Sequence, residues 1–139
     1  MTPLFTGKVT IYNSIPKTQV EDRHWDRFVI EKCQIQSGFV ENADGTIRNV
    51  MNATTVITKD VEHYKPADEY VKLPVDLRTA FFTVKTGDFV VFGVVEDKVT
   101  TAQEYSELQA KYKDKGIKVN SFNAFINGMA VDNVSISNV

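Results

Sequence analysis

Two histidines and a single cysteine are the side chains of this 139-residue chain best suited to metal binding or nucleophilic catalysis. His24 and His63 lie far apart in the sequence, and no closely spaced set of ligands surrounds either of them. Cys33 lies in an apolar stretch without an activating base beside it, which is typical of a buried structural cysteine. The sequence therefore predicts no metal site and no catalytic nucleophile.

Four carboxylates between residues 60 and 69 could form an acid–base pair, but lysines alternate with them. Mixed charge of this kind is typical of a solvated loop. The glycines form neither a phosphate-binding loop nor a dinucleotide-binding motif, and Gly87 is expected at a turn that needs a positive φ. We therefore expect no enzymatic activity, no catalytic or cofactor-binding residue and no cofactor.

Six phenylalanines in the second half of the chain could stack on nucleic-acid bases. Such a surface needs Lys or Arg beside the rings, and only Lys85 is close, so packing in the core is the expected role. Successive strand residues point to opposite faces, so Phe81 and Phe82 cannot both face the core. We expect one of the two to be a subunit contact. The six are Phe81, Phe82, Phe89, Phe92, Phe122 and Phe125.

Composition indicates a single domain, residues 1–139, with a hydrophobic core of ordinary size. Hydrophobic residues make up 42% of the chain and charged residues 24%, as in a typical globular protein. The formal net charge is −2, and no basic run indicates nucleic-acid recognition. Neither a long apolar run nor a signal peptide is present, so we expect a cytoplasmic origin and no membrane contact.

Most of the elements that must position these residues are predicted to be strands. The stretch from Trp25 to Ile35 has no purely apolar face, which predicts a strand that is packed on both sides or broken by a bulge. Turn signals stand at 42–45, 86–88 and 127–128. The expected strands are Lys8–Tyr12, Trp25–Ile35, Asn52–Lys59, Ala80–Lys85, Phe89–Val95, Ile117–Ile126 and Met129–Ile136.

One helix is well signalled. Thr101 and Glu104 form a capping box, and Tyr105, Leu108 and Tyr112 follow at helical spacing, with Gly116 as an expected stop. Far more strand than helix is predicted. The sequence therefore predicts a mainly β fold, a small antiparallel β-barrel or sandwich, with one packed α-helix at about 101–115.

Residues 60–78 carry two prolines, many charges and no sustained period. A connection of this length in a small domain is usually functional or disordered. We expect a long loop that is mobile in the free subunit, because it has little apolar surface to offset the entropy of ordering.

The order of elements in the second half resembles that of the small neck proteins of tailed bacteriophages, the minor capsid or head-closure (stopper-like) family. The resemblance rests on the strand Phe82–Lys85, the Gly87-Asp88 turn, the strand Phe89–Gly93, the Glu96-Asp97 step and the helix from Thr101. In the first half, Val9–Asn13 and Trp25–Ile30 are similar to the opening strands of that family. Many members carry a His-Trp pair near the last strand, where this chain has Met129-Ala130-Val131.

The resemblance implies a structural virion protein that is made in the bacterial host cytoplasm and forms a ring, a dodecamer, in the head–tail connector. Its implied partners are portal or adaptor proteins, tail-side neck proteins and the packaged DNA, which it would contact non-specifically. The predicted loop would face the channel or a neighbouring subunit. The candidate residues are Glu62, His63, Tyr64, Lys65, Asp68, Glu69, Tyr70 and Lys72.

Two alternatives remain open at the level of sequence. A tail-terminator or tail-completion ring protein would share the same physical properties. A monomeric β-barrel that binds nucleic acid or a small ligand belongs to a different class, and the state of assembly distinguishes it from a ring protein.

Overall fold

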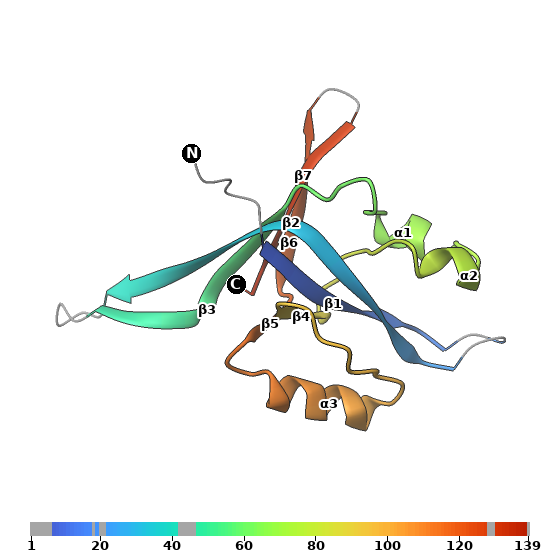
Figure 1. Ribbon diagram of the computed structural model, residues 1–139, viewed down its shortest axis with the longest axis horizontal. Coiled ribbons are helices and arrows are strands. Elements are labelled where there is room, and N and C mark those ends of the chain that lie inside the picture. Colours follow the sequence, from blue (N-terminus) through green and yellow to red (C-terminus); the bar gives the residue numbers. More distant parts are fainter. Residues whose placement is uncertain (1–6, 18, 20–21, 42–46, 128–129, 139) are drawn as a thin grey trace.

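The computed structural model describes residues 7–17, 19, 22–41, 47–127 and 130–138. In this part of the chain, seven strands form one antiparallel sheet in the order β5-β4-β1-β2-β3-β7-β6 (Figure 1). The mainly β fold class predicted from the sequence is confirmed. The strands are β1 Gly7–Ile15, β2 His24–Glu41, β3 Ile47–Thr58, β4 Phe89–Phe92, β5 Gly116–Lys118, β6 Ser121–Asn127 and β7 Ala130–Ser137.

The sheet curls around an inner core without closing into a complete barrel. Side chains from strands near both ends of the strand order share this core, which requires the two ends of the sheet to approach each other. The Asn120 N–H donates to the Ser137 carbonyl at 2.9 Å and ties the β5–β6 connection to β7. The inner core contains Val9, Ile11, Ile30, Cys33, Val56, Phe82, Val84, Val90, Ile117, Val119, Val134 and Ile136.

A second apolar cluster, the outer core, joins helix α3 (Ala102–Lys111) to the opposite face of the sheet. The rings of Trp25 and Tyr105 stack with centroids 4.6 Å apart, and Leu108 is buried beside them. As the sequence predicted, the Thr101 hydroxyl caps the helix by accepting from the Glu104 N–H at 3.1 Å. The outer core consists of Tyr12, Trp25, Phe89, Val91, Val99 and Leu108.

Gly116 does not stop this helix, contrary to the sequence prediction. The helix ends at Lys111, and Gly116 begins β5. A Cβ atom at Gly116 would lie 2.7 Å from Cζ of Phe89 and 2.7 Å from the Val90 carbonyl oxygen. The position therefore requires glycine because strand β4 approaches it closely.

Strand β2 is packed on both sides and also contains a bulge, and the sequence predicted one or the other of these features. Trp25 contributes to the outer core, whereas Ile30 and Cys33 contribute to the inner core. Ile30 and Cys33 are three residues apart and would point to opposite faces of a regular strand. Lys32 between them has a φ of 54°, and this bulge returns Cys33 to the inner face.

The connection between β3 and β4, residues 59–88, differs most from the sequence prediction. It holds two short helices, α1 (Ala67–Tyr70) and α2 (Val75–Arg78), where a long loop was expected. The predicted strand at 80–85 is reduced to one bridge between Phe82 and Tyr64. The other differences are smaller: β4 ends at Phe92 before Gly93, and the predicted strand 117–126 is divided into β5 and β6.

The predicted turns are confirmed where the structure describes them. Gly87 has a φ of 95°, as the turn at 86–88 requires. The turn signals at 42–45 and 127–128 lie wholly or partly outside the described residues, as does Met129. The strands that flank them pair as hairpins, Glu41 with Ile47 and Asn127 with Ala130.

Candidate functional site

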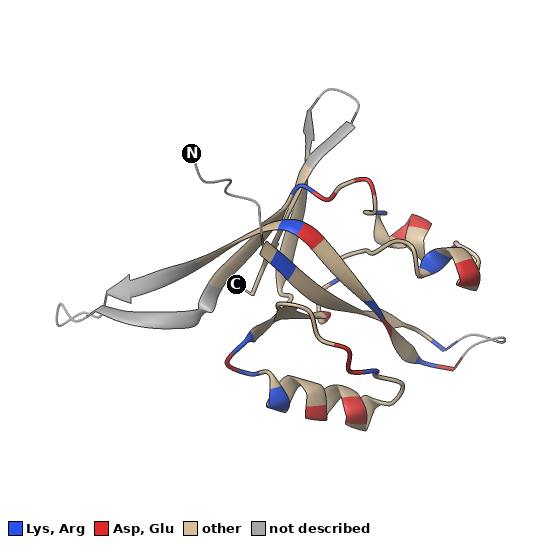
Figure 2. Cartoon of the chain, in the orientation of Figure 1, with Lys and Arg blue, Asp and Glu red and all other residues tan. Residues whose placement is uncertain are grey.

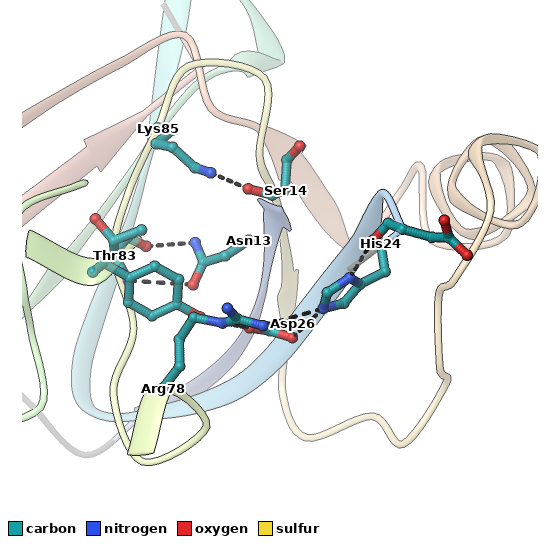
Figure 3. A network of polar contacts seen from close by, with 9 residues as sticks. Asn13, Ser14, His24, Asp26, Arg78, Thr83 and Lys85 are labelled. Carbon is teal, nitrogen blue, oxygen red and sulfur yellow. Dashed lines mark hydrogen bonds and ion pairs between the residues drawn. The ribbon is translucent and has the colours of Figure 1, made fainter. Parts of the chain in front are cut away.

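A network of polar contacts attaches the β3–β4 connection to the first two strands (Figure 3). Asp26 of β2 lies at one centre of this network. Its Oδ2 atom accepts from the Tyr70 hydroxyl at 3.1 Å and from Arg78 Nε at 2.6 Å. Tyr70 and Arg78 end the two short helices and are both buried, so this carboxylate holds both helices against the sheet.

His24 completes this side of the network. Its Nε2 atom lies 3.0 Å from Asp26 Oδ1 and 3.4 Å from Arg78 Nη2, and its Nδ1 atom lies 2.9 Å from the Asp22 carbonyl oxygen. The sequence predicted an ordinary strand-end residue here. The His24 ring and the Arg78 guanidinium therefore share the Asp26 carboxylate, one at each oxygen.

Asp88 is the second centre, and its side chain is fully buried. It accepts from Asn13 Nδ2 at 2.8 Å, from the Ser14 N–H at 3.1 Å and from the Lys85 N–H at 3.1 Å. Burial raises the pKa of the Asp88 carboxyl to about 6, against these hydrogen bonds and the nearby Lys85, which lower it. The Lys85 ammonium donates to the Ser14 carbonyl. Burial lowers the pKa of this ammonium.

The Asn13 side chain links strand β1 to the β3–β4 connection. It pairs with both backbone groups of Thr83, as the backbone of a neighbouring strand would. Its side-chain amide donates to the Thr83 carbonyl at 2.6 Å and accepts from the Thr83 N–H at 3.2 Å (Figure 3). Within the described part of the chain, the buried Thr83 hydroxyl has no hydrogen-bond partner. The charged groups of the network bond to one another and to the backbone, so the arrangement fits attachment of the connection better than catalysis.

Some of the residues predicted to contact a channel or a neighbouring subunit are buried or half-buried in the structure. Tyr70 is fully buried and cannot face a channel or a neighbouring subunit. His63, Tyr64 and Lys65 are half-buried. The expectation of a long irregular loop is therefore wrong, since the segment holds two short helices with buried anchors. The sequence did not indicate them because the anchors are spaced too irregularly to give a periodic signal. The candidates that remain exposed are Glu62, Asp68, Glu69 and Lys72.

The two consecutive phenylalanines point in opposite senses, as expected. Phe82 is fully buried in the inner core, so it is not a subunit contact. Phe81 is half-exposed, and the Lys65 ammonium lies 5.1 Å from its ring centroid. The expected core role is wrong for Phe122 and Phe125, which are 43% and 48% exposed on the edge strand β6.

Asp60, Glu62 and His63 lie close together, although the sequence predicted neither an acid–base pair of these carboxylates nor a metal site at His63. Their potential ligand atoms lie within 4.8 Å of one another. Asp60 already uses both oxygens, one 2.7 Å from His63 Nδ1 and one accepting from the Glu31 N–H at 3.1 Å. This arrangement is that of a buried carboxylate that fastens the end of β3, and the three residues carry no argument for a bound cation.

Cys33 has the environment that the sequence predicted. It is 1% exposed, and burial raises the pKa of its thiol to about 11. A thiol with such a pKa is not ionised at neutral pH and is a poor nucleophile.

The described part of the chain has several shallow surface hollows. One hollow of about 270 Å³ lies beside the network and is lined in part by His24, Trp25 and Asp26. Another of about 410 Å³ lies at β5, with Phe89 and Ile117 in its lining. Among the described helices, none has the length and apolar character needed to cross a membrane.

The chain was compared with protein families, with curated proteins and with solved structures, and only the first comparison gives a match. No curated protein and no solved structure is similar enough to the chain to count as a match. A family model matches residues 4–138, which is nearly the whole chain. The chain therefore belongs to the family of unknown function DUF6751.

Proposed function

We propose that the chain is a structural protein of the tailed-bacteriophage neck, which forms a ring in the head–tail connector and closes the head below the portal. The proposal starts from the resemblance of its element order to head-closure proteins. Its partners would be portal or adaptor proteins above the ring, tail-side neck proteins below it and the packaged DNA within it. The assembled protein would be part of the virion.

The observation that carries the proposal is a pair of two-stranded ribbons that project from the body (Figure 1). Strand β3 pairs with β7 only over Thr55–Thr58, whereas the β2–β3 pairing continues to Glu41 and Ile47. The β6–β7 hairpin likewise extends beyond the part of β7 that pairs with β3. A hairpin of two strands is at best marginally stable in water, so ribbons of this length suit a protein that packs them on neighbours.

Charge is consistent with a ring around DNA. The net charge of −2 and the mixed surface charges allow passage of a duplex without tight binding. A strongly basic channel would instead neutralise phosphates and retain the DNA. The same ribbons and charges also suit a tail-terminator or tail-completion ring, and the position of the protein in the particle separates these alternatives.

The test is to purify tailed particles from bacteria that produce the chain and to delete its gene. We expect peptides of the chain in intact particles at ring stoichiometry. Without the gene, we expect filled heads that lose DNA or fail to join tails in electron micrographs. Complete, infectious particles without the chain would contradict the proposal. A particle reconstruction would then place the ring next to the portal or at the tail end.

A further inference from the structure

The two short helices of the β3–β4 connection present an exposed apolar surface, which we call the α1–α2 face. Val71, Val75 and Leu77 are 45%, 52% and 53% exposed. Three large aliphatic side chains are thus exposed within seven residues of sequence, which makes this connection a candidate contact site. The buried anchors Tyr70 and Arg78 flank these three residues and attach the stretch to the sheet, which lowers the cost of ordering it when it binds.

Acidic side chains surround this apolar surface. Asp68, Glu69 and Asp76 are exposed on the same two helices, and Lys72 is the one basic residue among them. The α1–α2 face therefore offers aliphatic contacts with a net negative rim. A partner should present an apolar hollow with a positive rim.

The chain itself carries such a surface at β5, which we call the β5 face. The lining of the hollow of about 410 Å³ at this strand includes two nearly fully buried apolar residues, Phe89 and Ile117, together with the exposed Lys113 and Lys118. Lys115 is also exposed beside it, and Asp114 is the one acid in this stretch. Strand β5 is an edge of the sheet and has only three residues.

The two faces lie on opposite sides of the body. Figures 1 and 2 show α1 and α2 on one side, and β5 with the lysine-rich C-terminal end of α3 on the other. We propose that the α1–α2 face of one copy docks on the β5 face of a second copy. Val75 and Leu77 would contact the hollow, and the acidic rim would meet the lysines.

This contact is heterologous, because different surfaces of the two copies meet. Each added copy leaves one α1–α2 face and one β5 face open, so the contact extends to a closed ring if its rotation closes, and otherwise to an open helical filament. The inference rests on the proposed ring, for which it names the subunit interface. It also explains why these aliphatic side chains are exposed in an isolated subunit.

The experiment reverses the charge of each face in the full-length chain. One set of substitutions makes the α1–α2 face basic, and the other makes the β5 face acidic. Each variant then repels its own copies, but in an equimolar mixture both contacts again join opposite charges. The two sets are Asp68→Lys, Glu69→Lys and Asp76→Lys, and Lys113→Glu, Lys115→Glu and Lys118→Glu.

Self-association is measured by sedimentation equilibrium at low salt over a wide concentration range. We expect each variant alone to associate about tenfold or more weakly than the parent, and the mixture to return to within about threefold of it. Added salt should weaken the parent contact, because rim charges are screened. Circular dichroism and thermal unfolding verify that the exposed substitutions leave the fold intact.

A matched control changes charge elsewhere. Glu31→Lys with Glu96→Lys alters exposed residues outside both faces and should associate like the parent. Three results would each overturn the inference: a parent that stays monomeric at the highest concentration, a reversed variant that associates like the parent, or a mixture that does not associate.

These results are separate from the test on particles. A chain that is found in the neck but fails the charge-reversal experiment has a different subunit interface, and the proposed function stands. A chain that passes the charge-reversal experiment but is absent from particles forms this contact in another assembly.

Discussion

At the scale of single residues, Asp88 and Asn13 decide how the β3–β4 connection is attached. Asn13 bonds to Thr83 in place of a backbone partner, and Asp88 collects N–H donors from β1 and from its own turn. Two effects oppose each other at Asp88. Burial favours the neutral acid, whereas the N–H donors favour the carboxylate.

The balance at Asp88 predicts a dependence of stability on pH. Its pKa is raised on folding from an ordinary 3.8 to about 6, so the folded protein binds more protons than the unfolded chain between these values. The contribution of Asp88 to the free energy of unfolding is therefore highest below about pH 4. It falls by up to about 3 kcal/mol as the pH rises through about 6. Asp88→Asn removes this dependence.

The measurement is urea unfolding of the parent and of Asp88→Asn at pH 4 and pH 7. The variant loses hydrogen bonds and should be less stable at pH 4, with a deficit that shrinks at pH 7. A deficit that grows with pH would mean that the N–H donors outweigh burial and that the pKa of Asp88 is lowered.

Thr83 provides a second test at this scale. Within the described chain its hydroxyl is buried without a partner, which costs free energy relative to an apolar group of the same shape. Thr83→Val should leave the stability unchanged or raise it by about 1 kcal/mol, as measured by denaturant unfolding. A loss of more than that would reveal an undetected partner of the hydroxyl. Thr83→Ser, which keeps the hydroxyl, is the matched comparison.

At the scale of elements, α1 and α2 are helices of four residues that would not form alone. Isolated helices this short are unstable in water, so tertiary contacts must hold them. Tyr70 and Arg78 bond to Asp26, and Phe82 and Val84 extend into the inner core. The connection therefore behaves as part of the core and not as a tether.

Replacement of Glu62–Leu73 by a short Gly/Ser linker should consequently unfold or strongly destabilise the protein. A sharper version is Tyr70→Ala, which removes a fully buried ring and should lower the free energy of unfolding by about 3–5 kcal/mol. The matched control Val71→Ala alters an exposed neighbour and should change it by less than about 0.5 kcal/mol. Equal effects of Tyr70→Ala and Val71→Ala on thermal and denaturant unfolding would contradict the structure.

At the scale of the whole molecule, a curled sheet carries two projecting ribbons and two complementary faces. None of these surfaces belongs to a long amphipathic helix or a coiled coil, which would drive stable association without other proteins. The charged rims of the two faces contribute little in water at physiological salt. Assembly should therefore depend on partners that bring the copies together.

We expect the purified chain to be monomeric or weakly associated at physiological salt, and to form a ring when neck partners provide a template. Light scattering over a concentration series should give a mass that approaches that of the monomer on dilution. A tight dimer with a constant mass at all concentrations would contradict the proposed ring, because a closed twofold contact is complete with two copies and does not extend further.

Local patterns in the sequence were enough to predict the β-rich fold class, the capping box of α3, the turn at Gly87 and the two-sided packing of β2. These features depend on neighbours within a few residues, such as Thr101 with Glu104, or on the alternation along one strand. The opposite directions of Phe81 and Phe82 followed from the same alternation. Which of the two is buried did not, because that depends on the position of the chain over the inner core.

Tertiary structure alone decided the nature of residues 60–78. Tyr70 and Arg78 reach Asp26 across more than forty positions of sequence, and Asn13 reaches Thr83 across seventy. Contacts at such distances leave no periodic signal, and Pro66 and Pro74, which precede the two short helices, looked like loop residues. The same anchors hold two short helices where a loop was predicted, since burial of one ring and one ion pair offsets the entropy of ordering that local propensity could not.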